Sequence, residues 1–465
     1  MRRVIIICFI ILATSCKTEK TKPEIEQLVQ QIEKCNKLKY EHVGMDGHTT
    51  VQYKNYIKLR EKATTKELLS LLKHKNSVVK GYASMALADR KYSKLYEIIT
   101  PFLESGETVE TQNSDMTSNQ ELAEVFYFRV FYQNNINKLS IKDSLFFSLQ
   151  SQKIDSVIIC SKKSNGFLLE VALEKCKVNP NLYTRIKELS LQKNKYAITA
   201  LAKYKKREDI PFLIGLGENS LLAISYFPDE AFWNFLLKYK ESNKSLDYFM
   251  AIASYRNINA KKLLSDIYST CDSIAINSLD EALIKNYCKV YQSLILKIWE
   301  NSKTIDLTGT MKLIKDCPKK ASFSFAKGLL NSKAYNFLEL DYNYGTKDSI
   351  MPLMIETITK YDKGSLLEIC NKNIANADFM ELSSVLDLIK NNHIVGTKQN
   401  LLKRLNTKNF PFDIFQITET LLSFKDSNTN KKLVLILKEK RNDWDSGNWS
   451  GAFRELLAKN KLELN

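Results

Sequence analysis

The sequence predicts an all-α fold, and three observations lead to this prediction. Glycine and proline are scarce, at 14 and 8 of 465 residues, whereas β-sandwiches and barrels need many turns that contain them. Hydrophobic residues make up 44% of the chain, which is normal for a folded protein. They recur at the three- and four-residue spacing of amphipathic helices along most of the sequence. We therefore expect a large folded protein that is mainly helical.

Residues 1–15 have the pattern of a signal peptide. A basic start and an apolar stretch over residues 4–13 precede small residues and Cys16. An apolar run this short does not span a bilayer as a helix. Residues 12–16, Leu-Ala-Thr-Ser-Cys, resemble the bacterial lipobox, with Ala13 at the position where leucine is commonest. The resemblance implies that Cys16 becomes the first residue of the mature chain and carries lipid on its sulfur.

A lipid on Cys16 implies a location in the cell envelope. In lipoproteins of Gram-negative bacteria, an aspartate after the lipidated cysteine commonly retains the protein at the inner membrane, and here Lys17 stands at that position. We therefore expect an outer-membrane lipoprotein, facing either the periplasm or the cell surface. Two or more acyl chains anchor a protein stably, at about 0.8 kcal/mol per buried methylene. Residues 16–24 are short and polar, and we expect them to form a tether.

Residues 25–465 are predicted to form the folded, helical part. Apolar residues at helical spacing predict a first helix from Ile25. The stretch 40–51 contains two glycines and is predicted to be a loop. Residues 105–119 contain almost no apolar side chain, and we expect a long mobile loop there.

The clearest local signal is a pair of short helices in residues 64–104. Thr64 and Glu67 have the spacing of a capping box, in which each side chain bonds a backbone amide of the other residue. Asn76 is predicted to cap a second helix, whose apolar face begins at Val79. Because the turn between the two helices is short and polar, they are predicted to form an antiparallel hairpin.

This hairpin resembles a HEAT-type repeat. In that family one helix carries paired leucines, the turn is short and polar, and the next helix opens with valine and has alanine where helices touch. Similar patterns recur farther along, and the clearest copies span 64–104 and 186–268. Their uneven spacing indicates degenerate repetition. The resemblance implies an α-solenoid of degenerate HEAT-like helix pairs.

The C-terminal half continues with amphipathic stretches that are predicted to be helices. Trp444 and Trp449 flank a glycine-containing turn before a final helix. We interpret these two tryptophans as sealing the last repeat against solvent, with a ligand-stacking site as the alternative. The other predicted helices include residues 366–369, 379–389, 414–422 and 433–437.

The charge of the chain is strongly basic but dispersed. The formal net charge is +17 and is carried mostly by lysine, whereas arginine is preferred for phosphate contacts. The basic runs 205–207 and 438–441 are predicted to lie at helix ends, where cations favour the helix dipole. We interpret them as solvated surface, with an anion-binding patch as the alternative, and expect no nucleic-acid partner.

The cysteines do not predict a disulfide framework. Cys8 lies in the signal peptide, and without it and the lipidated cysteine seven remain, which is an odd number without CxxC spacing. Cys288 follows the spacing of an apolar helix stripe and is interpreted as a buried residue. Disulfides between Cys160 and Cys176, or between Cys271 and Cys288, would each link adjacent helices and remain open alternatives.

No catalytic motif is present in the sequence, and we expect neither an enzyme nor a bound cofactor. The segment from His42 through Asp46 to His48 has the residue types of a metal site, but a plain loop is the favoured interpretation. The acidic pairs at 229–230 and 280–281 are predicted to lie at helix starts, where carboxylates favour the helix dipole.

These patterns favour a membrane-anchored, non-catalytic scaffold that binds a protein partner. A repeat array offers a large contact surface without a deep pocket. Two alternatives remain open. A glycan-binding surface lipoprotein would stack sugars on exposed aromatic residues, although most tyrosines and phenylalanines follow apolar helix faces. An immunity-type lipoprotein would neutralise a toxin in the envelope.

Overall fold

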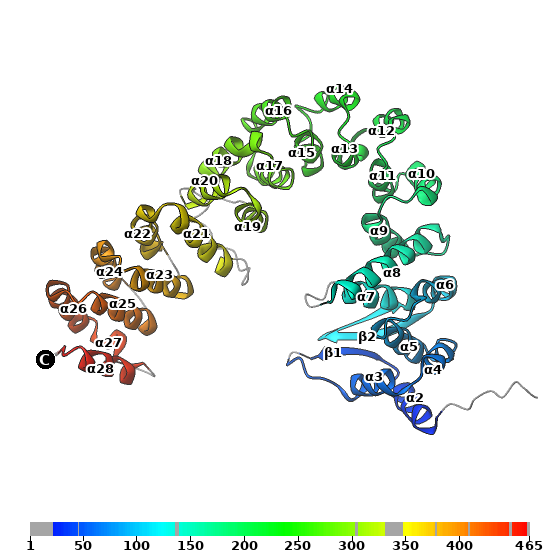
Figure 1. Cartoon of the computed structure of the whole chain (residues 1–465), viewed down its shortest axis with the longest axis horizontal. Coiled ribbons are helices and arrows are strands. Elements are labelled where there is room, and N and C mark those ends of the chain that lie inside the picture. The colour runs from blue at the N-terminus through cyan, green and yellow to red at the C-terminus, as the bar shows by residue number, and fades with distance from the viewer. Residues whose placement is uncertain are drawn as a thin grey trace, which may run out of the picture. The chain divides into compact units, whose positions relative to one another are not determined.

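The computed structural model is mostly helical, with little strand (Figure 1). The chain divides into two compact units, Met1–Ala223 and Ile224–Asn465. Among the described helices, none combines the length and the apolar character that a membrane span requires. The predicted signal peptide, 1–15, and Cys16 lie outside the described residues. The structure describes residues 22–44, 46–134, 139–302, 306–330, 347–376, 379–407, 410–445 and 449–462.

The first unit contains helices and one small sheet. Its elements, in chain order, are α2 (Pro23–Cys35), β1 (Leu38–Val43), α3 (Val51–Lys62), α4 (Thr65–Leu71), α5 (Ser77–Asp89), α6 (Leu95–Ser105), β2 (Thr108–Ser114), β3 (Met116–Glu121), α7 (Leu122–Asn134), α8 (Ile141–Cys160), α9 (Gly166–Lys175), η1 (Pro180–Leu182), α10 (Tyr183–Leu191), α11 (Lys195–Ala202), η2 (Arg207–Asp209), α12 (Ile210–Gly215) and η3 (Gly217–Ser220), with α13 (Leu221–Tyr226) at the boundary. One continuous hydrophobic core runs from Ile25 in α2 to Leu201 in α11. Pro23 opens α2, because a missing N–H is harmless in a first turn. The predicted tether, 16–24, is therefore wrong at its end, since Pro23 and Glu24 already belong to the helix.

The predicted capping box is confirmed at the start of α4. The Thr64 hydroxyl accepts a hydrogen bond from Glu67 N at 3.2 Å, and the Glu67 carboxylate accepts one from Thr64 N at 2.7 Å. Asn76 caps α5 by accepting from the amides of Val78 and Val79. Each such cap contributes about 1 kcal/mol. Helices α4 and α5 pack against each other, so local capping and apolar spacing were sufficient to predict both elements.

Two of the predicted loops are wrong, because they contain the strands of a three-stranded sheet. The strands have the order β1-β2-β3, with β1 parallel and β3 antiparallel to β2. In β2, exposed and buried residues alternate, and Val109 and Thr111 face the core. This two-residue period is typical of a half-buried strand even when few residues are apolar. The turn between β2 and β3 places Ser114 at a φ of 53°.

The sheet lies against α5, and a glycine allows the close approach. A Cβ atom on Gly81 would lie 2.6 Å from Leu38 Cδ1 on β1, which is shorter than van der Waals contact. The neighbouring Tyr82 is buried, and its hydroxyl bonds both backbone groups of Lys39 on β1. Strand β1 is therefore fixed to α5 by packing and by hydrogen bonds.

The second unit is helical throughout its described residues. Its elements are η4 (Glu230–Phe232), α14 (Trp233–Leu237), α15 (Leu246–Ala253), α16 (Ile258–Tyr268), α17 (Ser273–Lys285), η5 (Lys289–Tyr291), α18 (Gln292–Asn301), α19 (Leu307–Asp316), α20 (Lys319–Leu330), α21 (Lys347–Tyr361), η7 (Lys363–Ser365), α22 (Leu366–Asn376), α23 (Phe379–Asn392), η8 (Val395–Thr397), α24 (Lys398–Leu405), α25 (Pro411–Ser423), α26 (Ser427–Glu439), α27 (Arg441–Trp444) and α28 (Ser450–Lys459). The four helices predicted over residues 366–437 are confirmed as α22, α23, α25 and α26, and the final helix as α28.

Helices of the second unit pack mainly on the next helix and on the next but one. Helix α17 contacts α15 and α19, α21 contacts α19 and α23, and α25 contacts α23 and α27. A second series runs from α18 to α20 and from α22 through α24 to α26. Each helix therefore shares its buried face with near neighbours in the sequence.

The predicted burial of Cys288 is wrong, because the helix ends before it. Asn286 follows the last residue of α17, and its side chain donates to Ala282 O at 3.1 Å. Cys288 then adopts an extended conformation, with φ −145°, before η5, and it is partly exposed. All seven cysteines among the described residues are free thiols, so neither of the disulfides considered from the sequence is formed.

Candidate functional site

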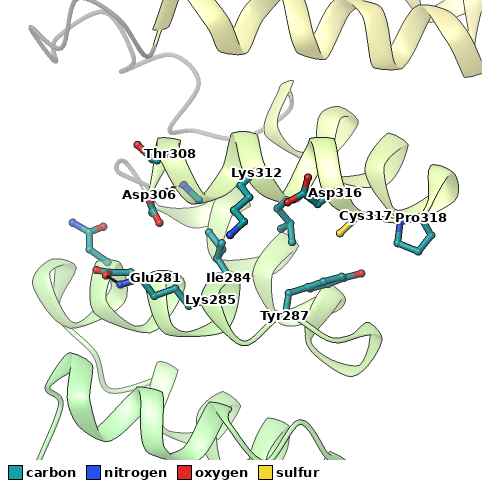
Figure 2. Close-up of a pocket in the computed structure, with 13 residues that line it drawn as sticks. Glu281, Ile284, Lys285, Tyr287, Asp306, Thr308, Lys312, Asp316, Cys317 and Pro318 are labelled. Carbon is teal, nitrogen blue, oxygen red and sulfur yellow. Dashed lines mark hydrogen bonds and ion pairs between the residues drawn. The ribbon is translucent and has the colours of Figure 1, made fainter. Parts of the chain in front are cut away.

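The strongest candidate site is an open pocket between α17 and α19 in the second unit, with a volume of about 860 Å³ (Figure 2). Ligand pockets commonly have volumes of about 300–1,000 Å³. The buried side chains Ile284 from α17 and Leu313 from α19 lie at its base. Tyr287 and Pro318 add further apolar surface at one end. The pocket therefore offers an apolar base that is open to solvent.

Charged side chains line the pocket above this base. Lys285 is held by Glu281 on the same helix, with 2.5 Å between Lys285 Nζ and Glu281 Oε1. The Lys312 side chain extends from α19 toward α17, as Figure 2 shows. Within the described part of the chain, neither Lys312 nor Asp316 forms an ion pair. The charges of Lys312 and Asp316 are thus available to a ligand.

A buried carboxylate holds the helices of the pocket together. Asp280 on α17 is fully buried and accepts from Trp299 Nε1 of α18 at 3.0 Å. Its other oxygen accepts from Asp306 N at 3.3 Å, and Asp306 in turn caps α19 by accepting from Gly309 N at 3.0 Å. Burial raises the pKa of Asp280 to about 7.

The prediction that Asp280 and Glu281 open a helix is therefore wrong. The residue that caps α17 is Asp272, which accepts from Ala275 N at 2.8 Å. Asp280 lies two turns farther along, on the buried face. The other acidic pair agrees with its prediction, because Asp229 caps η4 by accepting from Ala231 N.

Two further polar side chains of the pocket lining have raised pKa values. Burial raises the pKa of the Cys317 thiol, which keeps the sulfur protonated and weakly nucleophilic at neutral pH. Burial likewise raises the pKa of Tyr287 to about 12. None of the four histidines lines the pocket. The Cys317 thiol and the Tyr287 hydroxyl therefore stay protonated at neutral pH.

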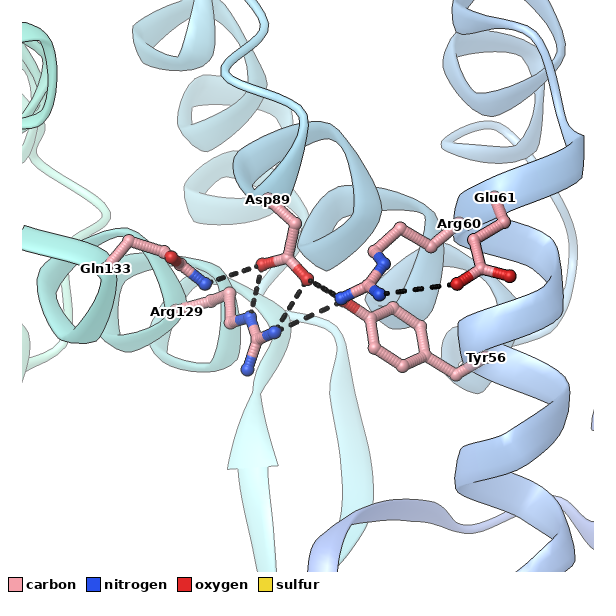
Figure 3. A network of polar contacts seen from close by, with 6 residues as sticks. All are labelled: Tyr56, Arg60, Glu61, Asp89, Arg129 and Gln133. Carbon is pink, nitrogen blue, oxygen red and sulfur yellow. Dashed lines mark hydrogen bonds and ion pairs between the residues drawn. The ribbon is translucent and has the colours of Figure 1, made fainter. Parts of the chain in front are cut away.

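A second polar cluster lies in the first unit and surrounds Asp89, as shown in Figure 3. The Asp89 carboxylate accepts two hydrogen bonds from Arg129, at 2.7 and 2.6 Å. It also accepts from Tyr56 Oη at 2.5 Å, from Arg60 at 3.2 Å and from Gln133 at 2.8 Å. The donors come from α3 and α7, and Asp89 ends α5, so the cluster joins three helices.

The Asp89 cluster is a structural feature rather than a reactive one. Burial alone would raise the pKa of Asp89, but the hydrogen bonds and the charge of Arg129 outweigh it and lower the pKa. The pKa of Asp155 on α8 is shifted in the opposite direction. It accepts only from Tyr127 Oη, at 2.9 Å, and burial raises its pKa to about 7. The five donors around Asp89 leave no lone pair directed at a ligand.

The side chains of the segment considered from the sequence as a metal site have different hydrogen-bond partners. His48 Nδ1 lies 2.8 Å from Asp46 Oδ1, whereas His42 Nδ1 lies 3.2 Å from the backbone oxygen of Gly47. In the described ranges, no group of three potential ligand side chains is positioned to hold a metal ion. His42 lies in β1, whereas Asp46 and His48 follow the strand, so only the second half of this segment is a loop.

The two C-terminal tryptophans differ in their surroundings. Trp444 is buried, stacks on Phe453 with ring centroids 4.6 Å apart, and donates to Leu437 O at 2.9 Å. This agrees with its predicted role in sealing the last helices. Trp449 packs against Phe412 at 4.9 Å but keeps 39% of its surface exposed.

An exposed aromatic patch lies between α7 and α9 in the first unit, and the sequence pattern does not reveal it. Phe128 lies between Tyr132 and Phe167, with ring centroids 6.3 and 6.0 Å away. Tyr132 and Phe167 are 63% and 55% exposed. Their neighbours Phe126 and Tyr127 are buried, as their spacing predicted.

The sequence did not reveal the pocket either, because its two walls are separated in the chain by α18. Each wall taken alone has the pattern of an ordinary amphipathic helix.

The basic runs 205–207 and 438–441 lie at or just beyond the ends of α11 and α26, as predicted.

Comparison of the chain with known protein families, with curated proteins and with solved structures found no match.

Proposed function

We propose that this chain is a membrane-anchored lipoprotein that acts as a non-catalytic, protein-binding scaffold in the cell envelope. The lipobox at Cys16 supports the anchor, through the sequence alone. The sequential packing of the helices supports an α-solenoid of HEAT-like pairs, because in such arrays each repeat contacts only its neighbours. Such arrays present extended surfaces that suit recognition of another protein.

The observation that carries this proposal is the pocket between α17 and α19. Its apolar base accommodates an apolar side chain of a partner, and Lys312 and Asp316 lie where charges of both signs on the same segment would meet them. A mixed lining of this kind suits a protein segment better than a small anion or a hydrocarbon. The protonated Cys317 thiol and the lack of histidine in the lining favour binding over catalysis.

Site-specific photocrosslinking in native membranes tests this proposal. A photoreactive phenylalanine derivative replaces Lys312 in the pocket and, as a matched control, the exposed Lys262 on α16. We expect one discrete adduct from position 312 and none from position 262. Competition by the unmodified protein should remove the adduct. Equal labelling from both positions, or no adduct from position 312, refutes the pocket as a recognition site.

The anchor is tested separately with a Cys16→Ala variant. If lipid on Cys16 holds the chain at the membrane, the variant should move into the soluble fraction after cell lysis. The unchanged protein should enter the detergent phase when detergent and water are separated. A Cys16→Ala variant that stays with the membrane refutes the lipid anchor.

The aromatic patch on α7 and α9 favours a second candidate function, glycan binding. Sugar rings stack on exposed aromatic side chains, and Tyr132, Phe128 and Phe167 form a contiguous group of this kind. A glycan array should then show ligands whose binding is lost in the double variant Tyr132→Ala and Phe167→Ala. Binding that persists in this variant argues against the patch.

A further inference from the structure

The two edges of the sheet in the first unit differ in how they are protected. At β1, Lys39 N–H donates to Tyr82 Oη at 2.9 Å, and the Tyr82 hydroxyl donates to Lys39 O at 2.8 Å. Val43 N at the end of β1 donates to His48 O at 3.1 Å. The Tyr82 side chain and a loop thus occupy backbone groups of Lys39 and Val43, which protects this edge against a further strand.

The other edge, β3, is open. Asn113 pairs with Met116 across a two-residue turn, and in such hairpins this pair and every second pair exchange the ladder hydrogen bonds. Thr117 and Asn119 consequently direct their backbone N–H and C=O groups away from β2. Over the ranges that the structure describes, these groups have no partner within the chain.

Strand β3 also lacks the features that usually block an edge. Residues 116–119 are exposed on both faces of the strand. The strand contains no lysine and no proline, and its register with β2 is regular, without a bulge. An open edge of this kind is a template for an additional strand from another chain.

The charges around β3 indicate which side chains the added strand would carry. Residues 95–128 contain seven acidic residues and no lysine, arginine or histidine, in a chain whose net charge is +17. Lysine side chains pair with Glu97, Glu107 and Glu110. In the described part of the chain, Asp115 and Glu121 form no ion pair, and they stand at the two ends of β3.

We propose that the outer edge of β3 binds an extended, basic segment of a partner protein as a fourth strand of the sheet. Backbone hydrogen bonds to Thr117 and Asn119 would hold the strand, and Asp115 and Glu121 would attract basic side chains at its ends. Six residues of strand span about 20 Å, so these basic side chains stand about six residues apart. This surface belongs to the first unit and does not depend on the pocket between α17 and α19.

A second copy of the chain fits this edge poorly. Antiparallel pairing of two β3 strands would bring Asp115 of one copy near Glu121 of the other. Like charges directly opposite each other on adjacent strands are destabilising. The charge pattern therefore selects a basic partner over self-association.

Two synthetic peptides test the proposal with the full mature chain. One has alternating threonine and valine with lysine at both ends, and its matched control has glutamate at both ends. We expect the lysine peptide to bind at least about tenfold more tightly, and its affinity to fall as salt is raised. Hydrogen exchange at Thr117 and Asn119 should slow when it binds. Equal binding of both peptides, or no protection at these amides, overturns the proposal.

Two variants separate strand addition from loss of folding. Asn119→Pro removes an outward N–H that is not part of the ladder with β2. We expect this variant to bind the lysine peptide more weakly, while its helical circular dichroism stays unchanged. The double variant Asp115→Lys and Glu121→Lys should reverse the preference, so that the glutamate peptide binds better. A misfolded protein cannot produce that reversal. A preference for the lysine peptide that survives the double variant, or unchanged binding by Asn119→Pro, overturns the proposal.

Discussion

Removing the charge of Asp89 should destabilise the first unit more than any surface substitution. In Asp89→Asn, the side chain keeps its shape, but the carboxylate that receives both hydrogen bonds of Arg129 is lost. The new amide group also points N–H donors toward donors on Tyr56, Arg60 or Gln133. Arg129 then remains as a largely buried cation without a counter-charge.

The expected loss in the free energy of unfolding follows from the burial of the three charged groups. Removing one partner of a buried ion pair costs about 3–5 kcal/mol. The side chains of Asp89 and Arg129 are only 6% and 19% exposed, whereas Arg60 is 30% exposed and can move toward solvent. We therefore expect a loss of about 3 kcal/mol in the free energy of unfolding, at the lower end of that range.

The assay exploits the placement of the tryptophans, all four of which lie in the second unit. In urea denaturation, Asp89→Asn should shift the circular dichroism transition of the first unit and leave the tryptophan fluorescence transition in place. Glu97→Gln is the matched control, because Glu97 pairs with Lys94 at the surface and contributes little there. An unfolding free energy within about 0.5 kcal/mol of the parent would show that Arg129 does not need the Asp89 carboxylate as its counter-charge.

Three further predictions concern buried groups. Burial raises the pKa of Asp280 to about 7, so the folded chain favours the neutral acid. The contribution of Asp280 to the stability of the second unit should therefore be largest below about pH 4 and be lost as pH rises to 7. In fluorescence-monitored unfolding, Asp280→Asn should lack this component of the pH dependence. Trp444 is 3% exposed and Trp449 is 39% exposed. Trp444→Phe removes a buried tryptophan, so acrylamide should quench the remaining fluorescence more easily. Trp449→Phe removes an exposed one, so the remaining fluorescence should be quenched less. Gly81→Val should destabilise the first unit by about 1–3 kcal/mol, because the new side chain overpacks against β1. Calorimetry would measure this loss. An unchanged melting temperature would show that α5 can move away from β1.

Local signals in the sequence predicted helices well. The caps at Thr64 and Asn76 need only residues within one turn, and the structure contains both. The helices α22, α23, α25 and α26 were likewise predicted from apolar spacing alone. Such elements are determined by neighbours in the chain, so no knowledge of distant contacts is required.

Features that depend on distant residues escaped prediction. Residues 108–121 contain mostly threonine, glutamine, asparagine and serine, and they become strands because Val109 and Thr111 find a core that distant helices provide. Asp280 was expected to lie at a helix start, but Asp272 caps that helix, and Asp280 instead bonds Trp299 in the interior. The pocket needs residues from α17 and α19 together, and neither helix shows it alone.

The parallel pairing of β1 with β2 also constrains how the first unit folds. Leu38 on β1 lies beside Thr111 on β2, and helices α3 to α6 occupy the chain between them. Hairpins of adjacent helices can form from neighbouring segments of the chain, but this sheet cannot close until β1 and β2, which are distant in sequence, have come together. We therefore expect the sheet to set the slow step of folding in this unit. Until that step, the apolar side of α5 that later covers β1 remains exposed to chaperones and proteases.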